Sequence, residues 1–186
     1  MNNIELITPR RCCLVVIDPQ ERLMKAVQKP ERVIKNINIL LRAFEVFDLP
    51  MVATTQYEKG LGPIVPEVEL PEKGLSKIDK TEFNCFFNRD FLKVMNGLSP
   101  AVDTLILAGV EAHICVFQTA ISAMNFGFTT WVATDAVSSR SKKNARQAIT
   151  LMQTNSIFCC PTETVVYQLL KKAGTQQFKA LLPHLK

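Results

Sequence analysis

The chain has 186 residues, a hydrophobic fraction of 47% and a formal net charge of +5 at pH 7. A chain of this length fits one domain with a substantial core, and we expect that domain to cover residues 1–186. No apolar run approaches the length of a membrane span and no signal-peptide pattern opens the chain, so we expect a cytoplasmic protein with no membrane partner.

The cysteines and the charges argue against two further classes of protein. The six cysteines include no C-x-x-C pair and the chain has only two histidines, so neither a zinc site nor a disulfide framework is indicated. The densest cluster of positive charge is Arg140, Lys142, Lys143 and Arg146. A solvated helix face explains this cluster better than a nucleic-acid patch does, so we expect no nucleic-acid partner.

The first third of the chain predicts two strands joined by a long helix. Residues 12–17 form a continuous apolar run, which is typical of a central parallel strand, and Asp18 places a carboxylate at its C-terminal end. An amphipathic helical pattern begins at Pro30 and stops at residues 48–50. Residues 51–55 predict the second strand.

The middle of the chain predicts a long loop, a short strand and a helix. Residues 56–73 contain glycine and proline with little periodicity, and the functional form that we expect for so long a loop is an active-site lid, the alternative being disorder. Residues 76–79 predict a third strand, which leads to Lys80. Asn88 is the expected cap of the next helix, which stops at residues 96–97.

The most informative stretch combines a buried strand, a turn and the start of a helix. Residues 105–108 are apolar without alternation, and we expect Gly109 to end this strand in a sharp turn. Helical spacing over residues 114–126 places the start of a helix close to Cys115. The free N–H groups and the dipole at a helix N-terminus favour a thiolate there. The alternative is a buried structural thiol, because free cysteine is among the most buried residue types.

The last third of the chain continues the alternation of strands and helices. We expect strands at residues 129–134 and 157–160 and a helix from about residue 142 to 153. A further helix is expected to be capped by Thr162, and a short C-terminal helix carries Phe178, Leu181 and Leu182. Such alternation predicts an α/β domain with a mainly parallel sheet.

Three chemically active side chains are expected to share one edge of that sheet. If the strands before Asp18 and Cys115 are neighbours at the topological switch point, their C-terminal ends open into one crevice, where α/β sheets bind ligands. Lys80 ends a strand that opens toward the same edge. A carboxylate to take the thiol proton, a cation and a cysteine at a helix start make a plausible acyl-transfer site. No glycine-rich nucleotide motif is present, so we expect no nucleotide cofactor.

Three motifs occur in this order along the chain, and their order and spacing are more specific than any one of them. They are Val16-Ile17-Asp18-Pro19-Gln20, Asp79-Lys80-Thr81-Glu82-Phe83 and Ala108-Gly109-Val110-Glu111-Ala112-His113-Ile114-Cys115-Val116. Over nearly its whole length the chain resembles the isochorismatase-like cysteine hydrolase superfamily. The resemblance implies a three-layer α/β/α, Rossmann-like fold with a six-stranded sheet. It also implies a triad of Asp18, Lys80 and Cys115, with Cys115 as the nucleophile.

The resemblance implies two further features of the turn before the cysteine. A non-proline cis peptide is expected between Val110 and Glu111. The amides of Glu111 and Cys115 are expected to form the oxyanion hole. His113 lies two residues before Cys115, where side chains seldom converge, so we do not expect it to be the catalytic base.

Three other residues are candidates for binding the substrate. Gln20 and Gln56 are polar residues at strand ends, and each is able to orient a carbonyl or an amide, although ordinary loop hydrogen bonding explains them as well. Phe83 is a candidate for lining a pocket, with core packing as the alternative.

Departures from the family pattern bear on the substrate. Nicotinamidases bind a metal through an aspartate and histidines after the second strand, whereas residues 56–63 contain no histidine, so we expect no metal and no cofactor. This segment instead resembles the isochorismatase-domain-containing subgroup. The founding isochorismate-cleaving enzymes work without the nucleophilic cysteine, so Cys115 points to hydrolysis of a small amide or related C–N bond through a thioester.

A different class of function remains open. The alternative to the enzyme is a catalytically silent scaffold or binding protein of the same fold. In either case the resemblance and the apolar C-terminal segment predict a homo-oligomer, a dimer or a tetramer.

Overall fold

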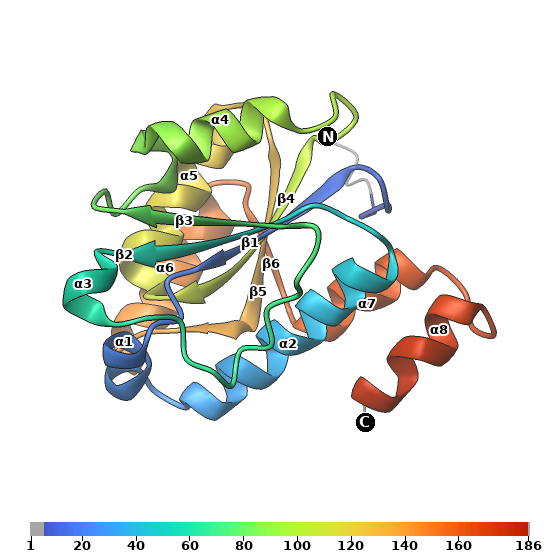
Figure 1. The fold of residues 1–186 in the computed structure, drawn as a ribbon, viewed down its shortest axis with the longest axis horizontal. Helices are drawn as coiled ribbons and strands as arrows, with labels where there is room; N and C mark the ends of the chain where they lie inside the picture. Colours follow the sequence, from blue (N-terminus) through green and yellow to red (C-terminus); the bar gives the residue numbers. More distant parts are fainter. Residues whose placement is uncertain (1–5, 186) are drawn as a thin grey trace.

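The computed structural model describes residues 6–185, which form a six-stranded parallel sheet flanked by helices (Figure 1). The strand order is β3-β2-β1-β4-β5-β6. The strands are β1 (Cys12–Ile17), β2 (Met51–Gln56), β3 (Leu75–Lys80), β4 (Thr104–Val110), β5 (Thr129–Ser138) and β6 (Phe158–Cys160). From the central strand β1, the chain first builds one half of the sheet through β2 and β3 and then the other half through β4, β5 and β6. β1 and β4 are therefore neighbours at the point where the strand order reverses. The predicted α/β fold is therefore confirmed.

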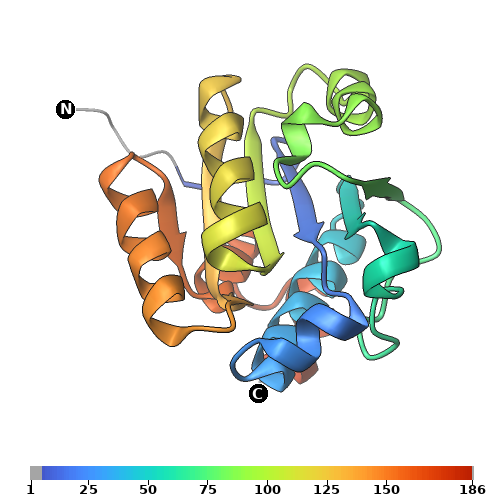
Figure 2. The same cartoon turned by 90° about the vertical axis from the view of Figure 1, so that its left-hand side faces the viewer.

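Helices cover both faces of the sheet, which gives three layers (Figures 1 and 2). One face carries α2 (Pro30–Val46), α7 (Thr162–Leu170) and α8 (Gln176–Leu181), and the other carries α4 (Arg89–Gly97), α5 (Phe117–Asn125) and α6 (Lys142–Thr154). The short helices α1 (Glu21–Ala26) and α3 (Glu58–Leu61) lie where the strands end. No helix of the described residues is both long and apolar enough to cross a membrane.

Alternate side chains of β1 enter two separate cores. Leu14 and Val16 pack on the α2 side of the sheet, whereas Val15 and Ile17 pack on the α5 side. All six residues of β1 are buried. Because neighbouring side chains of a strand point to opposite faces, a strand covered on both sides has a continuous apolar sequence.

Gly109 allows β1 and β4 to approach closely near the strand ends. Its φ is 116°, and a Cβ at this position would lie only 2.0 Å from the carbonyl oxygen of Ile17. The prediction that Gly109 ends the strand is wrong, because β4 continues to Val110, which pairs with Ser138 of β5. Glycine is therefore required at this position because the two strands approach closely, and not because the chain turns there.

Two predictions about the C-terminal part need correction. Thr162 does not cap α7: the carboxylate of Asp135 does, because its Oδ1 accepts hydrogen bonds from the Thr162 N–H (2.8 Å) and hydroxyl (2.7 Å). The C-terminal apolar segment is not a spare surface for a neighbouring chain. Leu181 is fully buried in the core of its own chain, and Phe178 packs against the same core.

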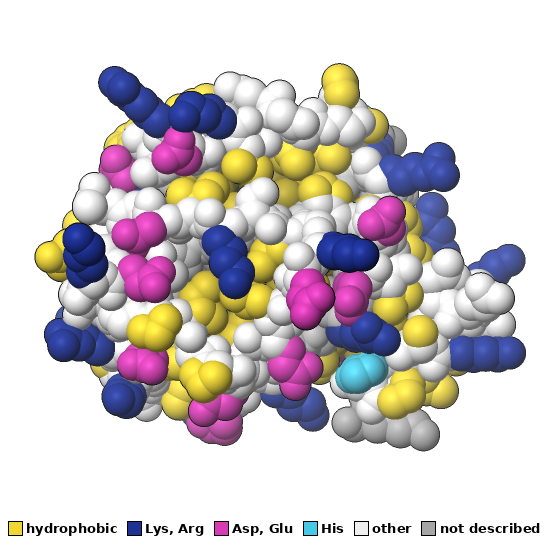
Figure 3. Space-filling model, viewed as in Figure 1, with side chains coloured by type: hydrophobic (Ala, Val, Ile, Leu, Met, Phe, Trp, Pro, Cys, Tyr) yellow, Lys and Arg dark blue, Asp and Glu magenta, His cyan; other side chains and the backbone are white. Residues whose placement is uncertain are grey.

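The long segment after β2 is ordered and packed rather than disordered. It contains α3, and Val65 and Val68 are buried against the α2-side core. A cavity of about 690 Å³ lies where the segment crosses β2 and β3, and no member of the predicted triad lines it. Figure 3 shows hydrophobic side chains in the hollowed middle of this face. A lid function for the segment stays a prediction.

Candidate functional site

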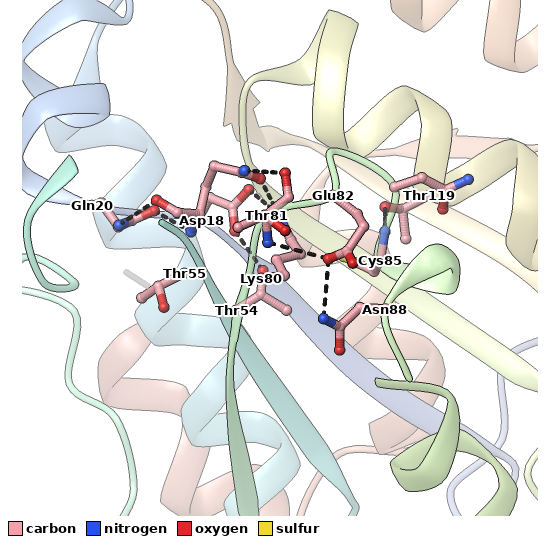
Figure 4. Close-up of polar contacts among 12 residues, drawn as sticks. Asp18, Gln20, Thr54, Thr55, Lys80, Thr81, Glu82, Cys85, Asn88 and Thr119 are labelled. Carbon is pink, nitrogen blue, oxygen red and sulfur yellow. Dashed lines mark hydrogen bonds and ion pairs between the residues drawn. The ribbon is translucent and has the colours of Figure 1, made fainter. Parts of the chain in front are cut away.

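Asp18 and Lys80 form an ion pair at the C-terminal edge of the sheet (Figure 4). Lys80 Nζ lies 2.7 Å from Asp18 Oδ2, and both side chains are fully buried. Asp18 directly follows β1 and has a φ of 51°, which turns its backbone out of the strand conformation. Lys80 is the last residue of β3. The two strands are separated by β2, so the pair spans the end of the middle strand.

Strand β2 supplies polar groups that hold this ion pair. Thr54 donates a hydrogen bond to the second carboxylate oxygen of Asp18 (2.6 Å), and Lys80 donates one to Gln56 Oε1 (2.9 Å). Sequence reasoning missed the role of Thr54. The available signal was a polar residue two positions before Gln56, which places both side chains on the same face of a strand that is buried throughout.

Cys115 lies in a π-helical turn, Ala112–Val116, that leads directly into α5. The Glu111 carbonyl accepts hydrogen bonds from the N–H groups of Ile114 (3.0 Å) and Val116 (3.3 Å), on either side of Cys115. The peptide bond between Val110 and Glu111 is cis. Single π-helical turns within helices are frequent at functional sites. Cys115 itself is only 5% exposed.

The charged pair acts directly on the cysteine thiol. Burial raises the pKa of Cys115, the Asp18 charge and a hydrogen bond to Asp18 raise it further, and the Lys80 charge opposes them. The resting form at neutral pH is therefore the thiol, although a helix start alone favours the thiolate. Burial is the largest single influence on Lys80 and disfavours its charge, but the Asp18 carboxylate, the nearby thiols of Cys85 and Cys115 and the hydrogen bond to Asp18 together outweigh it. The pKa of Lys80 is therefore raised and the side chain stays an ammonium.

The turn before Cys115 is tied to the segment after β5. Arg140 donates hydrogen bonds to the Glu111 carboxylate from its backbone N–H (2.8 Å) and from its guanidinium (2.6 Å). His113 Nδ1 lies 2.9 Å from the hydroxyl of Ser139, so its ring is engaged away from the triad. The sequence assigns Arg140 only to a solvated cluster of positive charges and does not predict this contact. Its ion pair with Glu111 joins residues that are far apart in sequence.

The three candidate substrate-binding residues have different surroundings. Gln20 donates hydrogen bonds from its side chain to the carbonyls of Gly62 (2.6 Å) and Gln56 (3.2 Å) and accepts one from the Gln56 N–H (2.6 Å). Gln56 donates one to the Thr81 carbonyl (2.7 Å) besides accepting one from Lys80. These amides therefore brace the strand ends. Phe83 is 55% exposed and follows Lys80 closely. Substrate binding by all three stays a prediction.

A second buried thiol lies beside the ion pair. Cys85, in the 3-10 turn Cys85–Phe87, is fully buried, and its N–H donates a hydrogen bond to the hydroxyl of Thr119 (3.1 Å). Burial raises its pKa to about 11, with the Lys80 charge opposing. Sequence reasoning did not single out this cysteine. Only the packing of this turn against α5 brings it close to the triad.

The polar groups that the described site brings together are a carboxylate, an ammonium and thiols. Within residues 6–185, no group of three or more His, Cys, Asp and Glu side chains is arranged to hold a metal ion. The prediction of metal-independent chemistry remains to be tested by elemental analysis, in which stoichiometric zinc or iron would contradict it.

Comparison with known proteins identifies the family of the chain. A family model of the isochorismatase domain matches residues 12–164. The chain belongs to the isochorismatase family. This family member is 31% identical to isochorismatase domain-containing protein 2 of Rattus norvegicus over 182 residues, which cover 97% of the chain and 83% of the relative. The protein of the same name from Danio rerio is 32% identical, with 97% and 90% covered.

Solved structures share the whole fold of this isochorismatase-family chain. The MAR1 ribonuclease from Caenorhabditis elegans superposes with a TM-score of 0.89 at 28% identity, covering 97% of this chain and 92% of the other. YcaC from Pseudomonas aeruginosa, solved with hexane-2,5-diol and covalent acrylamide, superposes with a TM-score of 0.90 at 25% identity, covering 99% and 93%. The fold is thus that of an isochorismatase-family hydrolase.

Proposed function

We propose that this protein is a cysteine hydrolase that cleaves a small amide or related C–N bond through a Cys115 thioester. The observation that carries the proposal is the fully buried Asp18–Lys80 ion pair beside the Cys115 thiol. Three ionisable groups removed from water in one place are costly for stability, and such clusters occur mostly where chemistry requires them.

Asp18 is the general base in the first half of the reaction. It accepts the proton of the Cys115 thiol as the sulfur attacks the substrate carbonyl, and the amides of Glu111 and Cys115 hold the resulting oxyanion. Asp18 then returns the proton to the nitrogen, the C–N bond breaks, and ammonia or an amine leaves the thioester. The Lys80 ammonium balances the charge that Asp18 carries between these steps.

The second half of the reaction restores the enzyme. Asp18 accepts a proton from a water molecule, whose oxygen attacks the thioester carbonyl, and the sulfur leaves as the carboxylic acid forms. Asp18 gives that proton to the sulfur, so the thiol and the carboxylate are both regenerated. No cofactor takes part, and the resting thiol is the form whose proton Asp18 accepts at the start of each cycle.

A related structure supports the choice of an electrophilic substrate. The P. aeruginosa neighbour holds a covalent acrylamide in its structure, which is a small electrophilic amide. Acrylamide adds to a nucleophile at its alkene carbon rather than at its carbonyl, so the adduct supports a reactive nucleophile and room for a small amide in that relative. Small amides of similar size are the substrate class that we propose for this chain.

The proposal is tested by measuring ammonia release from a panel of small primary amides. We expect turnover by the wild type and its loss in Cys115→Ala, whereas Cys159→Ala removes a half-buried thiol far from Asp18 in sequence and should retain turnover. Asp18→Asn should lower kcat by about 100-fold or more. Turnover that survives in Cys115→Ala, or is lost equally in Cys159→Ala, would contradict the proposal.

A further inference from the structure

A cavity of about 480 Å³ lies between the first turn of α2 and the helix α6, beside the end of β5. In Figure 2, α6 and the blue helices of the N-terminal part lie on either side of this region. Four of its lining side chains are cations and none is a carboxylate. The cations are Lys29, Arg32, Lys142 and Arg146, and the apolar floor is Val137, Ala145 and Ile149. No residue of the proposed triad lines it.

The cavity exists because the last strand of the sheet is short. β6 has three residues and pairs with β5 only as far as Ala133, so the outer edge of β5 beyond that point has no neighbouring strand. Side chains of α2 take over part of this edge: Arg32 Nη2 donates a hydrogen bond to the carbonyl of Val137 (3.0 Å). The Arg32 guanidinium is therefore held at the wall of the cavity.

The positive charge of the cavity is not balanced by the protein itself. Within the part of the chain that the structure describes, Arg11, Arg42, Lys80, Lys93 and Arg140 each pair with a carboxylate. None of the four cations of the cavity has a carboxylate within ion-pair distance in these same residues. Four unpaired cations around one hollow leave a strong positive potential.

Two helix N-termini add to this potential. Lys29 is the N-cap of α2, which has 17 residues, and Lys142 is the first residue of α6, which has 13 residues. The positive ends of both helix dipoles therefore lie at the cavity together with the four cations. The apolar floor favours a ligand that also has a nonpolar body.

We propose that this cavity binds a small organic phosphate. The phosphate group would be held by the cations, with Arg32 offering a planar pair of donors, while an aliphatic or cyclic body rests on Val137 and Ile149. A volume of about 480 Å³ is within the range of small-molecule sites. This binding site is separate from the proposed hydrolase reaction and does not depend on Cys115.

The test is calorimetric titration of the wild-type protein with phenyl phosphate, inorganic phosphate and benzyl alcohol. We expect saturable binding of one phenyl phosphate per chain, weaker binding of inorganic phosphate because it lacks the apolar body, and no binding of benzyl alcohol. Arg32→Gln, Lys142→Gln and Arg146→Gln should each weaken phenyl phosphate by about fivefold or more.

Lys143→Gln is the matched control. Lys143 is the exposed neighbour of Lys142 on the same helix, and it does not line the cavity. The control makes the same change in net charge, so its affinity should equal that of the wild type. Equal loss in Lys143→Gln, absence of saturable binding, or binding that none of the three cavity variants weakens would overturn the proposal.

Discussion

At the residue scale, the central feature is a pair of opposite charges in the protein core. Asp18 and Lys80 have no exposed side-chain surface, and Thr54 and Gln56 complete their hydrogen bonds. A buried ion pair adds little net stability, because the cost of removing two charges from water offsets their attraction. Its position beside Cys115 is therefore better explained by chemistry than by stability.

Removing one partner of this pair should be strongly destabilising. We expect Lys80→Met to lower the free energy of unfolding by about 3–5 kcal/mol, because the Asp18 carboxylate is left unpaired in the core. Lys77→Met on the same strand is the control, since Lys77 is exposed, and it should change stability by about 0.5 kcal/mol or less. Urea denaturation at neutral pH measures both. Similar losses in the two variants would count against a structural role of the pair.

Glu111 predicts a pH-dependent contribution to stability. Burial is the largest single influence and raises its pKa, but the hydrogen bonds and the charge of Arg140, with a contribution from His113, together outweigh it. The net pKa is lowered from the ordinary 4.5. A carboxylate whose pKa is lower in the folded state stabilises the protein fully above its unfolded pKa, and this contribution is lost as the pH falls through the folded value. The effect should be about 1 kcal/mol or less, because Arg140 is largely exposed.

The experiment compares the wild type with Glu111→Gln in urea denaturation at several pH values. We expect the wild type to be more stable near neutral pH and the difference to shrink as the pH falls from about 5 to about 3. A difference that stays constant over this range would show that ionisation of Glu111 contributes nothing.

At the scale of elements, the close contact of β1 and β4 determines where Asp18 and Cys115 lie. We expect Gly109→Ala to lower the free energy of unfolding by about 2–4 kcal/mol, because the new Cβ would overlap the Ile17 carbonyl and the φ is positive. Gly127→Ala is the control: its φ is 90°, but nothing lies within 4 Å of its Cβ position. It should cost about 1 kcal/mol.

Thermal or urea denaturation of the two variants separates overlap from backbone strain. A loss in Gly109→Ala no larger than that in Gly127→Ala would mean that the strands adjust without cost. The close approach of β1 and β4 would then not be required at this position.

The sequence predicted elements whose signals are local. The apolar run of β1, the amphipathic pattern of α2 and the Asn88 cap of α4 are all confirmed, because each depends on neighbouring residues. Features that depend on contacts between distant segments were missed. The capping of α7 by Asp135 is one such feature, since the carboxylate lies 27 positions before Thr162.

The residues of the candidate site also divide into those with a local sequence signal and those that depend on contacts between distant segments. Asp18, Lys80 and Cys115 were predicted as site residues because each stands in a recognisable motif, and their catalytic roles stay predictions. Thr54, Cys85 and Arg140 carry no such motif, and only the strand order and the packing of turns bring them to the site. The protonation state of the Cys115 thiol also required the structure, because burial is the largest influence on its pKa and depends on the packing of distant segments.

At the scale of the whole molecule, exposed aromatic side chains favour self-association. Phe87 and Phe126 are 70% and 58% exposed, and Phe126 stacks on Phe86 of the turn that contains Phe87. We expect light scattering at micromolar concentration to give a mass of at least two chains. Phe87→Asp should shift the protein toward the monomer.

Tyr167→Asp is the control for this shift, because Tyr167 is also exposed (45%) but lies on α7 and is not one of the aromatic residues Phe86, Phe87 and Phe126. It should leave the mass unchanged. A wild-type protein that is monomeric at micromolar concentration would contradict the predicted homo-oligomer.

The most direct test of Cys115 as the nucleophile is its alkylation by acrylamide, followed site by site with mass spectrometry. The experiment uses a protein that carries Cys159→Ser and Cys160→Ser, because these two half-buried thiols would compete with Cys115 for acrylamide. Cys12, Cys13 and Cys85 are buried and are kept. The raised pKa predicts a rate that keeps increasing as the pH rises toward the ordinary thiol value of 9.0.

We predict that Cys115 is alkylated before any other cysteine of the folded protein and that Asp18→Asn slows this reaction by about 100-fold, because the base is lost. Modification of Cys12, Cys13 or Cys85 with Cys115 untouched, or an unchanged rate in Asp18→Asn, would contradict the proposed role and return Cys115 to a buried structural thiol.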